Sequence, residues 1–170
     1  MQLKQINIAY QPVQDRLLLR ISTSEQVEFR LWLTRRLVAQ LLPAIAQLFA
    51  SRSAELSQNP QAQAALQEFQ SEAALQQAKF SNTYDADELK PATTGEPLLI
   101  HSINMRPLEA GHYLLLLQDA ENTKLQLRMD EVLLQGCLKL LRQTQLAAGW
   151  GLGDAPPASP QSAATPVQLN

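Results

Sequence analysis

Two histidines and a single cysteine are the side chains of this chain best suited to acid–base or nucleophilic chemistry. His101 lies in an apolar, alternating segment on the same predicted face as Ile103, His112 follows a glycine in a turn, and Cys137 falls in a leucine-rich helical stripe. These groups do not show the ligand spacing of a structural zinc site, and a thiol among leucines is typically buried and inert. The pattern therefore predicts no catalytic residue and no zinc site.

An acidic loop holds the other ligand-like side chains. Asp85, Asp87 and Glu88 are closely spaced, but the loop lacks the glycine that a calcium loop requires and has no supporting histidine. We interpret these three residues as solvated carboxylates. The sequence also contains no phosphate-binding glycine loop, dinucleotide fingerprint or serine-elbow motif. We therefore predict no metal site, no cofactor and no enzymatic activity.

A group of arginines around one tryptophan is the strongest candidate for binding. Arginine contacts phosphates in a bidentate manner, and an exposed tryptophan on a sheet can stack on a base or on a partner side chain. A solvated sheet face is the alternative interpretation. The candidate binding residues are Arg16, Arg20, Arg30, Trp32, Arg35 and Arg36, with Arg128 on the matching later segment.

Hydrophobic periodicity predicts the elements that position these residues. Alternation of apolar and polar side chains predicts three strands, at residues 6–10, 16–21 and 27–33. Thr34 is a predicted N-cap, and the apolar spacing after it predicts an amphipathic helix of about four turns. Pro43 lies inside this helix, so we predict a kink there or a break into two helices.

The same series of elements recurs later in the chain. Residues 10–48 and 104–141 each contain an extended segment that reaches a proline, a leucine run, a polar turn, an alternating strand, a capping residue (Thr34 and Asp130) and an apolar helix. Pro12 matches Pro107 at an offset of 95 residues, and the third strands align at an offset of 96. Leucine-rich sequences also align by chance, but the agreement in element order and caps favours an internal duplication.

The segments between and after the repeats differ in composition. Asn59 and Pro60 are predicted to open an alanine- and glutamine-rich connector helix that ends near Lys79. Residues 81–96 form an acidic loop. Residues 151–170 are rich in Pro, Ala, Gly and Ser and carry almost no charge, which predicts a disordered tail.

Together these features predict an α+β fold with an internally duplicated βββα repeat. A single globular domain, residues 1–150, would contain the repeats 1–52 and 97–148, joined by the connector helix and acidic loop of residues 53–96. Three strands with one helix form a marginal unit. We therefore expect two small antiparallel sheets, packed with helices, that share one core about a pseudo-twofold axis.

The composition favours a cytoplasmic protein. The chain has 170 residues, 45% apolar content and a formal net charge of −2, with no stretch long and apolar enough for a membrane span and no signal peptide. Its charge is uneven, because residues 1–50 are mildly basic and residues 51–100 are acidic.

The paired repeats of strands followed by a helix resemble, in topology, the single-stranded DNA and RNA binders of the PUR and Whirly type. Those families have four strands in each repeat, whereas this sequence predicts three, and none of their residue roles is carried over. The resemblance implies binding of a single strand on a sheet face.

The preferred functional prediction is a non-catalytic protein-interaction or scaffold module within a larger complex. A sheet face, an edge strand or the connector helix would contact the other protein, and the same logic extends to a homodimer. Leu18, Trp32 and either Leu115 or Leu117 are expected to be exposed as an apolar patch. Single-stranded nucleic-acid binding through the Arg/Trp face is the alternative, ranked second because the chain is acidic overall.

Overall fold

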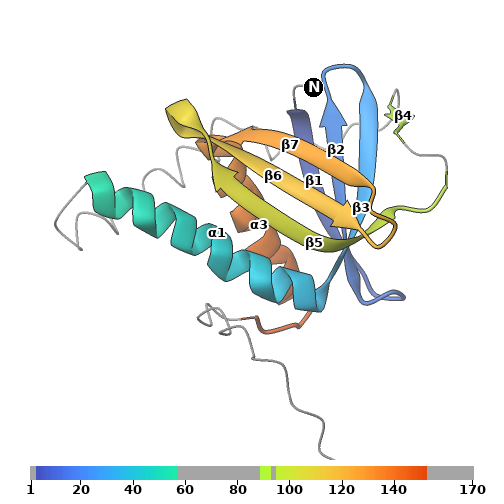
Figure 1. Cartoon of the computed structure of the whole chain (residues 1–170). Coiled ribbons are helices and arrows are strands. Elements are labelled where there is room, and N and C mark those ends of the chain that lie inside the picture. The colour runs from blue at the N-terminus through green and yellow to red at the C-terminus, as the bar shows by residue number, and fades with distance from the viewer. Residues whose placement is uncertain (1–2, 57–88, 93–94, 153–170) are drawn as a thin grey trace, which may run out of the picture.

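The computed structural model describes residues 3–56, 89–92 and 95–152 of the chain (Figure 1). The elements, in chain order, are β1 (Leu3–Gln11), β2 (Arg16–Thr23), β3 (Val27–Thr34), α1 (Arg35–Leu56), β4 (Lys90–Pro91), β5 (Leu98–Pro107), the short 3-10 helix η1 (Glu109–Gly111), β6 (His112–Asp119), β7 (Lys124–Asp130) and α3 (Glu131–Ala147). The predicted α+β class is confirmed. The predicted connector helix, and nearly all of the predicted tail, lie outside the described residues.

The strands form one sheet rather than the two small sheets predicted from the sequence. The seven-stranded sheet has the order β1-β2-β3-β5-β6-β7, with β4 also paired to β3. Four of the strand pairs are antiparallel. The two halves are joined by a parallel pair, in which Leu31 aligns with Leu98 and Trp32 with Leu99. Periodicity within a strand carries no information about such long-range pairing, so the sequence did not indicate this join.

A short extended segment also pairs with β3, although it falls in the predicted acidic loop. The backbone N–H of Lys90 donates to the carbonyl of Gln26 at 2.8 Å, and that of Ala92 donates to the carbonyl of Glu28 at 2.7 Å. Strand β4 thus covers the start of the β3 edge, and β5 covers a later part of it. An unpaired strand edge invites association, and these contacts satisfy much of this one.

Both helices begin at the caps that the sequence predicts. The hydroxyl of Thr34 accepts a hydrogen bond from the N–H of Leu37 at 3.3 Å, and the Asp130 carboxylate accepts one from the N–H of Leu133 at 2.8 Å. Helix α1 is continuous through Pro43 over 22 residues, so the predicted break is wrong, and the helix is longer than the predicted four turns.

The end of α3 has a well-defined stop signal. Gly149 has a φ of +69°, the left-handed region that glycine adopts without strain. Its N–H donates to the carbonyl of Leu146 at 2.9 Å, and the N–H of Trp150 donates to the carbonyl of Gln145 at 3.1 Å. This pair of bonds is the Schellman arrangement, and it turns the chain back toward the sheet.

The two halves share one hydrophobic core, because each helix reaches strands of the other half. Helix α1 packs against β3 and β5, and α3 packs against β1, β6 and β7. In Figure 1, β5–β7 cross in front of α3, and β1–β3 cross behind them at a large angle. A single apolar cluster contains residues of both helices and of both groups of strands, including Leu31, Ile45, Leu127 and Leu141. Among the described residues, neither half has a separate core.

The burial of leucines along the strands shows that the predicted apolar patch does not form. Leu115 and Leu117 are 5% and 2% exposed because they face the helices, not solvent. Leu18 points to the opposite face of the sheet but is only 7% exposed. Only Trp32 of the four remains partly accessible. The predicted patch of exposed leucines is therefore wrong.

The shared core predicts a strong contrast between two leucines of α3. Leu141 is fully buried, whereas Leu146 is 65% exposed. We expect Leu141→Ala to lower the free energy of unfolding by about 2–5 kcal/mol, because a cavity would remain between the two halves. The matched substitution Leu146→Ala should change it by less than about 0.5 kcal/mol. Urea unfolding measures both, and similar losses for the two variants would contradict this packing.

Candidate functional site

The candidate binding residues of β2 and β3 lie together on the sheet face turned away from α1 and α3, here called the outer face. The ladder between the strands makes Arg20 and Arg30 direct cross-strand partners and places Arg16 opposite Thr34. All three arginines are half-buried. Two guanidinium groups that face each other across neighbouring strands concentrate positive charge at one place on the sheet, which suits an anionic ligand.

An apolar row crosses the outer face beside the arginine pair. Ala9, Leu18 and Trp32 are aligned across β1, β2 and β3, and Trp32 is in turn aligned with Leu99 of β5. Leu99 is 39% exposed, which is high for a large apolar side chain in this fold. The indole of Trp32 therefore lies in a row of apolar side chains with arginines in the neighbouring rows.

Local contacts hold one of these arginines in place. The guanidinium of Arg30 donates a hydrogen bond to the carbonyl of Gly95 at 3.0 Å. Its Nε also lies 3.9 Å from a carboxylate oxygen of Glu28, on the same strand. Among the outward positions of β2 and β3, Glu28 is the one acidic residue.

The other candidate arginines are not all part of this group. Arg35 donates to the carbonyl of Trp150 at 2.8 Å, which ties the start of α1 to the segment after α3. Arg36 is exposed in the first turn of α1, which contains no acidic residue. Cations at a helix N-terminus oppose the helix dipole, and a bound anion would offset that cost.

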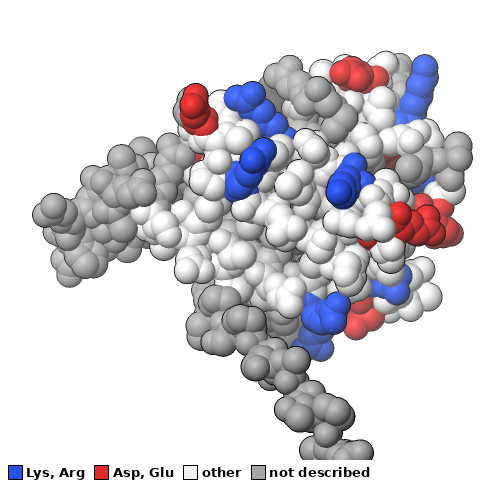
Figure 2. Space-filling model, viewed as in Figure 1, with Lys and Arg blue, Asp and Glu red and all other residues white. Residues whose placement is uncertain are grey.

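Arg128 lies on β7, separated from β3 by β5 and β6. There it forms a second row on the outer face, in which Leu114 is flanked by Arg106 and Arg128. Arg106 was not among the predicted site residues, because only the strand register places it opposite Leu114. Figure 2 shows the face over β5–β7 as largely uncharged, with separate Lys and Arg groups and with acidic groups mostly toward the rim.

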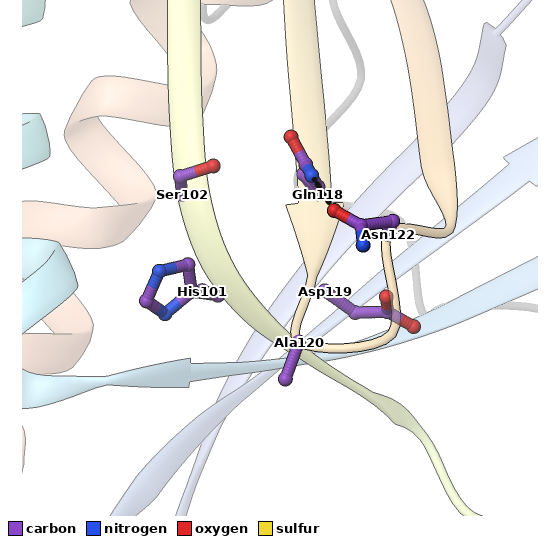
Figure 3. Close-up of a pocket in the computed structure, with 6 residues that line it drawn as sticks. All are labelled: His101, Ser102, Gln118, Asp119, Ala120 and Asn122. Atoms are coloured by element: carbon purple, nitrogen blue, oxygen red, sulfur yellow. Dashed lines mark hydrogen bonds between the residues drawn. The ribbon is translucent and has the colours of Figure 1, made fainter.

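A polar hollow of about 450 Å³ lies where β5 and β6 approach the β6–β7 turn (Figure 3). A β-bulge between Ile100 and Ser102 interrupts the alternation of β5, and His101, which lies in it, is exposed. The other lining residues are Ser102, Gln118, Asp119, Ala120 and Asn122.

The ionisable groups of the hollow do not face one another. The ring of His101 points away from the turn, whereas Asp119 points into it (Figure 3). The carboxylate of Asp119 accepts hydrogen bonds from the N–H groups of Glu121 at 2.9 Å and Thr123 at 2.8 Å. Asp119 thus stabilises the β6–β7 turn.

A hydrogen-bonded clasp, formed by Tyr10, Asp15, Trp150 and Arg35, was not predicted from the sequence. The carboxylate of Asp15 accepts bonds from the indole N–H of Trp150 at 2.7 Å and from the hydroxyl of Tyr10 at 3.0 Å. The two rings meet edge to face with centroids 6.0 Å apart. These donors lower the pKa of Asp15, that of Trp150 having the largest effect, and the bond to Asp15 raises the pKa of Tyr10.

Cys137 gives no indication of chemistry. Cys137 is buried in the core, and burial raises the pKa of its thiol to about 12. In the part of the chain that the structure describes, no three His, Cys, Asp or Glu side chains are grouped so as to hold a metal ion. The acidic trio Asp85, Asp87 and Glu88 lies outside that part.

None of the described helices has the length and apolar character needed to cross a membrane.

Comparison of the chain with protein-family profiles, curated proteins and solved structures found no match.

The clasp makes a prediction about Trp150. Asp15 has a φ of +47°, so Asp15→Gly preserves the turn while removing the acceptor. We expect the indole N–H of Trp150 to exchange with solvent faster in this variant than in the wild type, as measured by NMR hydrogen exchange. Asp15→Asn keeps an acceptor oxygen and should retain most of the protection. Unchanged exchange in Asp15→Gly would contradict the clasp.

The buried thiol predicts the sign of one contribution to alkaline stability. Above the ordinary pKa of 9.0 the unfolded thiol ionises, whereas the folded thiol stays protonated up to about pH 12. The free energy of unfolding should therefore fall by up to about 1.4 kcal/mol per pH unit in this window because of Cys137 alone. Urea unfolding of the wild type and of Cys137→Ala between pH 8 and about pH 10.5 isolates this slope. Equal slopes would contradict the assignment.

Proposed function

We propose that the chain is a non-catalytic, cytoplasmic binding module whose outer sheet face takes single-stranded nucleic acid. The observation that carries the proposal is the pairing of Arg20 with Arg30, directly beside the row that contains Trp32. A phosphate would accept hydrogen bonds from both opposed guanidinium groups, and a base would stack on the indole. Sheets that bind single strands combine these two features.

The position of the acidic residues supports the same partner. The chain has 16 acidic residues and a net charge of −2. At the described strand positions of the outer face, arginines outnumber acidic residues. The overall acidity, which ranked nucleic acid second on the sequence alone, therefore does not describe these positions.

A protein partner is the second candidate. On the sequence, this partner was supported by a predicted apolar patch, which does not form because Leu18, Leu115 and Leu117 are buried. Support for it comes from the exposure of Val13 (93%) in the β1–β2 turn, of Leu146 (65%) in α3 and of Leu99 (39%) beside Trp32. A scaffold role, or association with a second copy of the chain, would use these positions.

We also propose that the two halves derive from one duplicated βββα unit. Each half has three antiparallel strands followed by a capped helix. Leu17 pairs with Leu33 in the first half, and Tyr113 pairs with Met129 in the second. This supports an offset of 96 residues between β2 and β6 and between β3 and β7. In the first strands, Ile8 pairs with Leu19 as Met105 pairs with Leu115. This pairing supports an offset of 97 for the first strands, in place of the offset of 95 taken from the sequence.

The proposal predicts salt-dependent binding of single-stranded oligonucleotides, measured by fluorescence anisotropy with the full chain. Trp32→Ala should weaken binding by about 5-fold to 150-fold, which corresponds to the loss of about 1–3 kcal/mol of stacking. Trp32→Phe should recover part of the affinity because an aromatic ring remains. Arg20→Ala should make the slope of log K against log salt concentration shallower by about 0.7, the value for one phosphate contact on a single strand.

Lys139→Ala is the matched control for charge, because it removes one cation from α3, outside the outer face. It should change neither the affinity nor the salt slope appreciably. Circular dichroism and thermal melting of each variant separate loss of binding from loss of the fold. Absence of binding by the folded wild type at low salt, to both DNA and RNA strands, would refute the proposal.

A further inference from the structure

The polar hollow lies on the path that a strand bound to the outer face would follow. Ser102 and Gln118 are direct cross-strand partners on that face, and Lys124 lies opposite Gln118 on β7. Leu99, the partner of Trp32, precedes His101 by two residues on β5. At about 3.3 Å per residue, the hollow begins roughly 7–10 Å from the apolar row. Adjacent nucleotides can therefore occupy the tryptophan and the hollow.

The hydrogen-bonding groups of the hollow suit a planar, uncharged ligand. The amide of Gln118 donates to Asn122 Oδ1 at 2.6 Å, a bond visible in Figure 3. This bond leaves Gln118 Oε1 as an acceptor at one end of the pair and Asn122 Nδ2 as a donor at the other end (Figure 3). Donor and acceptor groups of this kind pair with the edges of nucleobases, and Ser102, the cross-strand partner of Gln118, adds a hydroxyl to the lining.

The charges around the hollow distinguish a base from a phosphate. Asp119 is among the lining residues, and its negative charge disfavours an anion there. Lys124, by contrast, is exposed next to Gln118 and can contact a phosphate outside the hollow. The volume of about 450 Å³ falls within the range of small-molecule sites, about 300–1,000 Å³. An uncharged heteroaromatic ring is the chemical group that these surroundings accept.

We propose that this hollow is a nucleobase subsite, in which Gln118 and Asn122 read the edge of one base while its neighbour stacks on Trp32. The inference rests on the proposed binding of single strands. It adds a preference for particular bases, which the arginines and the indole alone do not supply, because phosphate contacts and stacking are largely indifferent to sequence.

The test compares affinities of the full chain for homopolymeric single strands of A, C and T, matched in length, and for an abasic strand of the same length. Gln118→Leu removes the amide at similar volume. Asn122→Gly removes the other amide at a residue with a φ of +66°, which glycine tolerates. Gln143→Leu is the matched control, because Gln143 is exposed on α3.

The subsite predicts that the wild type discriminates between bases and that each hollow variant lowers the ratio of best to worst affinity at least about 5-fold. Affinity for the abasic strand should not change, and the control should keep the wild-type ratio. Equal wild-type affinity for all bases, or an unchanged ratio in both hollow variants, would overturn the subsite and leave the proposed function standing. Absence of binding to any strand would overturn both.

Discussion

The arrangement of this molecule depends on a core that neither half can form alone. Helix α1 packs on β5 and α3 packs on β1, so each helix covers a strand of the other half. Three strands and one helix bury too little apolar area for independent stability, whereas the combined cluster extends from Ile6 to Trp150. The parallel contact between β3 and β5 adds a backbone connection to this packing. Folding of the two halves should therefore be one cooperative event.

This constraint also creates the outer face. With the helices on one side of the sheet, alternation of side chains sends Arg20, Arg30 and Trp32 to the other side. The β3–β5 join then places Leu99 beside Trp32 and continues the same face toward the polar hollow. The clasp of Asp15 with Trp150 has a different role, because it fastens the segment after α3 to the β1–β2 turn. Stability and the candidate binding surface thus use separate side chains.

Local features of this fold could be predicted from the sequence, and long-range features could not. The strand alternation around Leu17 and Leu31, the caps Thr34 and Asp130 and the burial of Cys137 follow from short-range physical rules, and the structure confirms them. The single sheet, the bulge at His101 and the clasp depend on contacts between residues far apart, up to 135 positions for Asp15 and Trp150. The arginine and tryptophan group was found by its residue types. Strand register, which periodicity does not give, brings this group together on β2 and β3 and separates Arg128 from it. The same register places Arg106 opposite Leu114, so the sequence did not single out Arg106.

The two tryptophans provide the most direct test of a binding surface on the outer face. Trp32 lies on that face, whereas the indole N–H of Trp150 is held by Asp15 in the clasp. Titration of the isotope-labelled chain with a single-stranded oligonucleotide, followed by NMR of the two indole N–H signals, reports on both at once. Our account predicts that the Trp32 signal shifts or broadens while the Trp150 signal stays in place. A Trp32 signal that does not respond at saturating oligonucleotide, or a shift confined to Trp150, would contradict it.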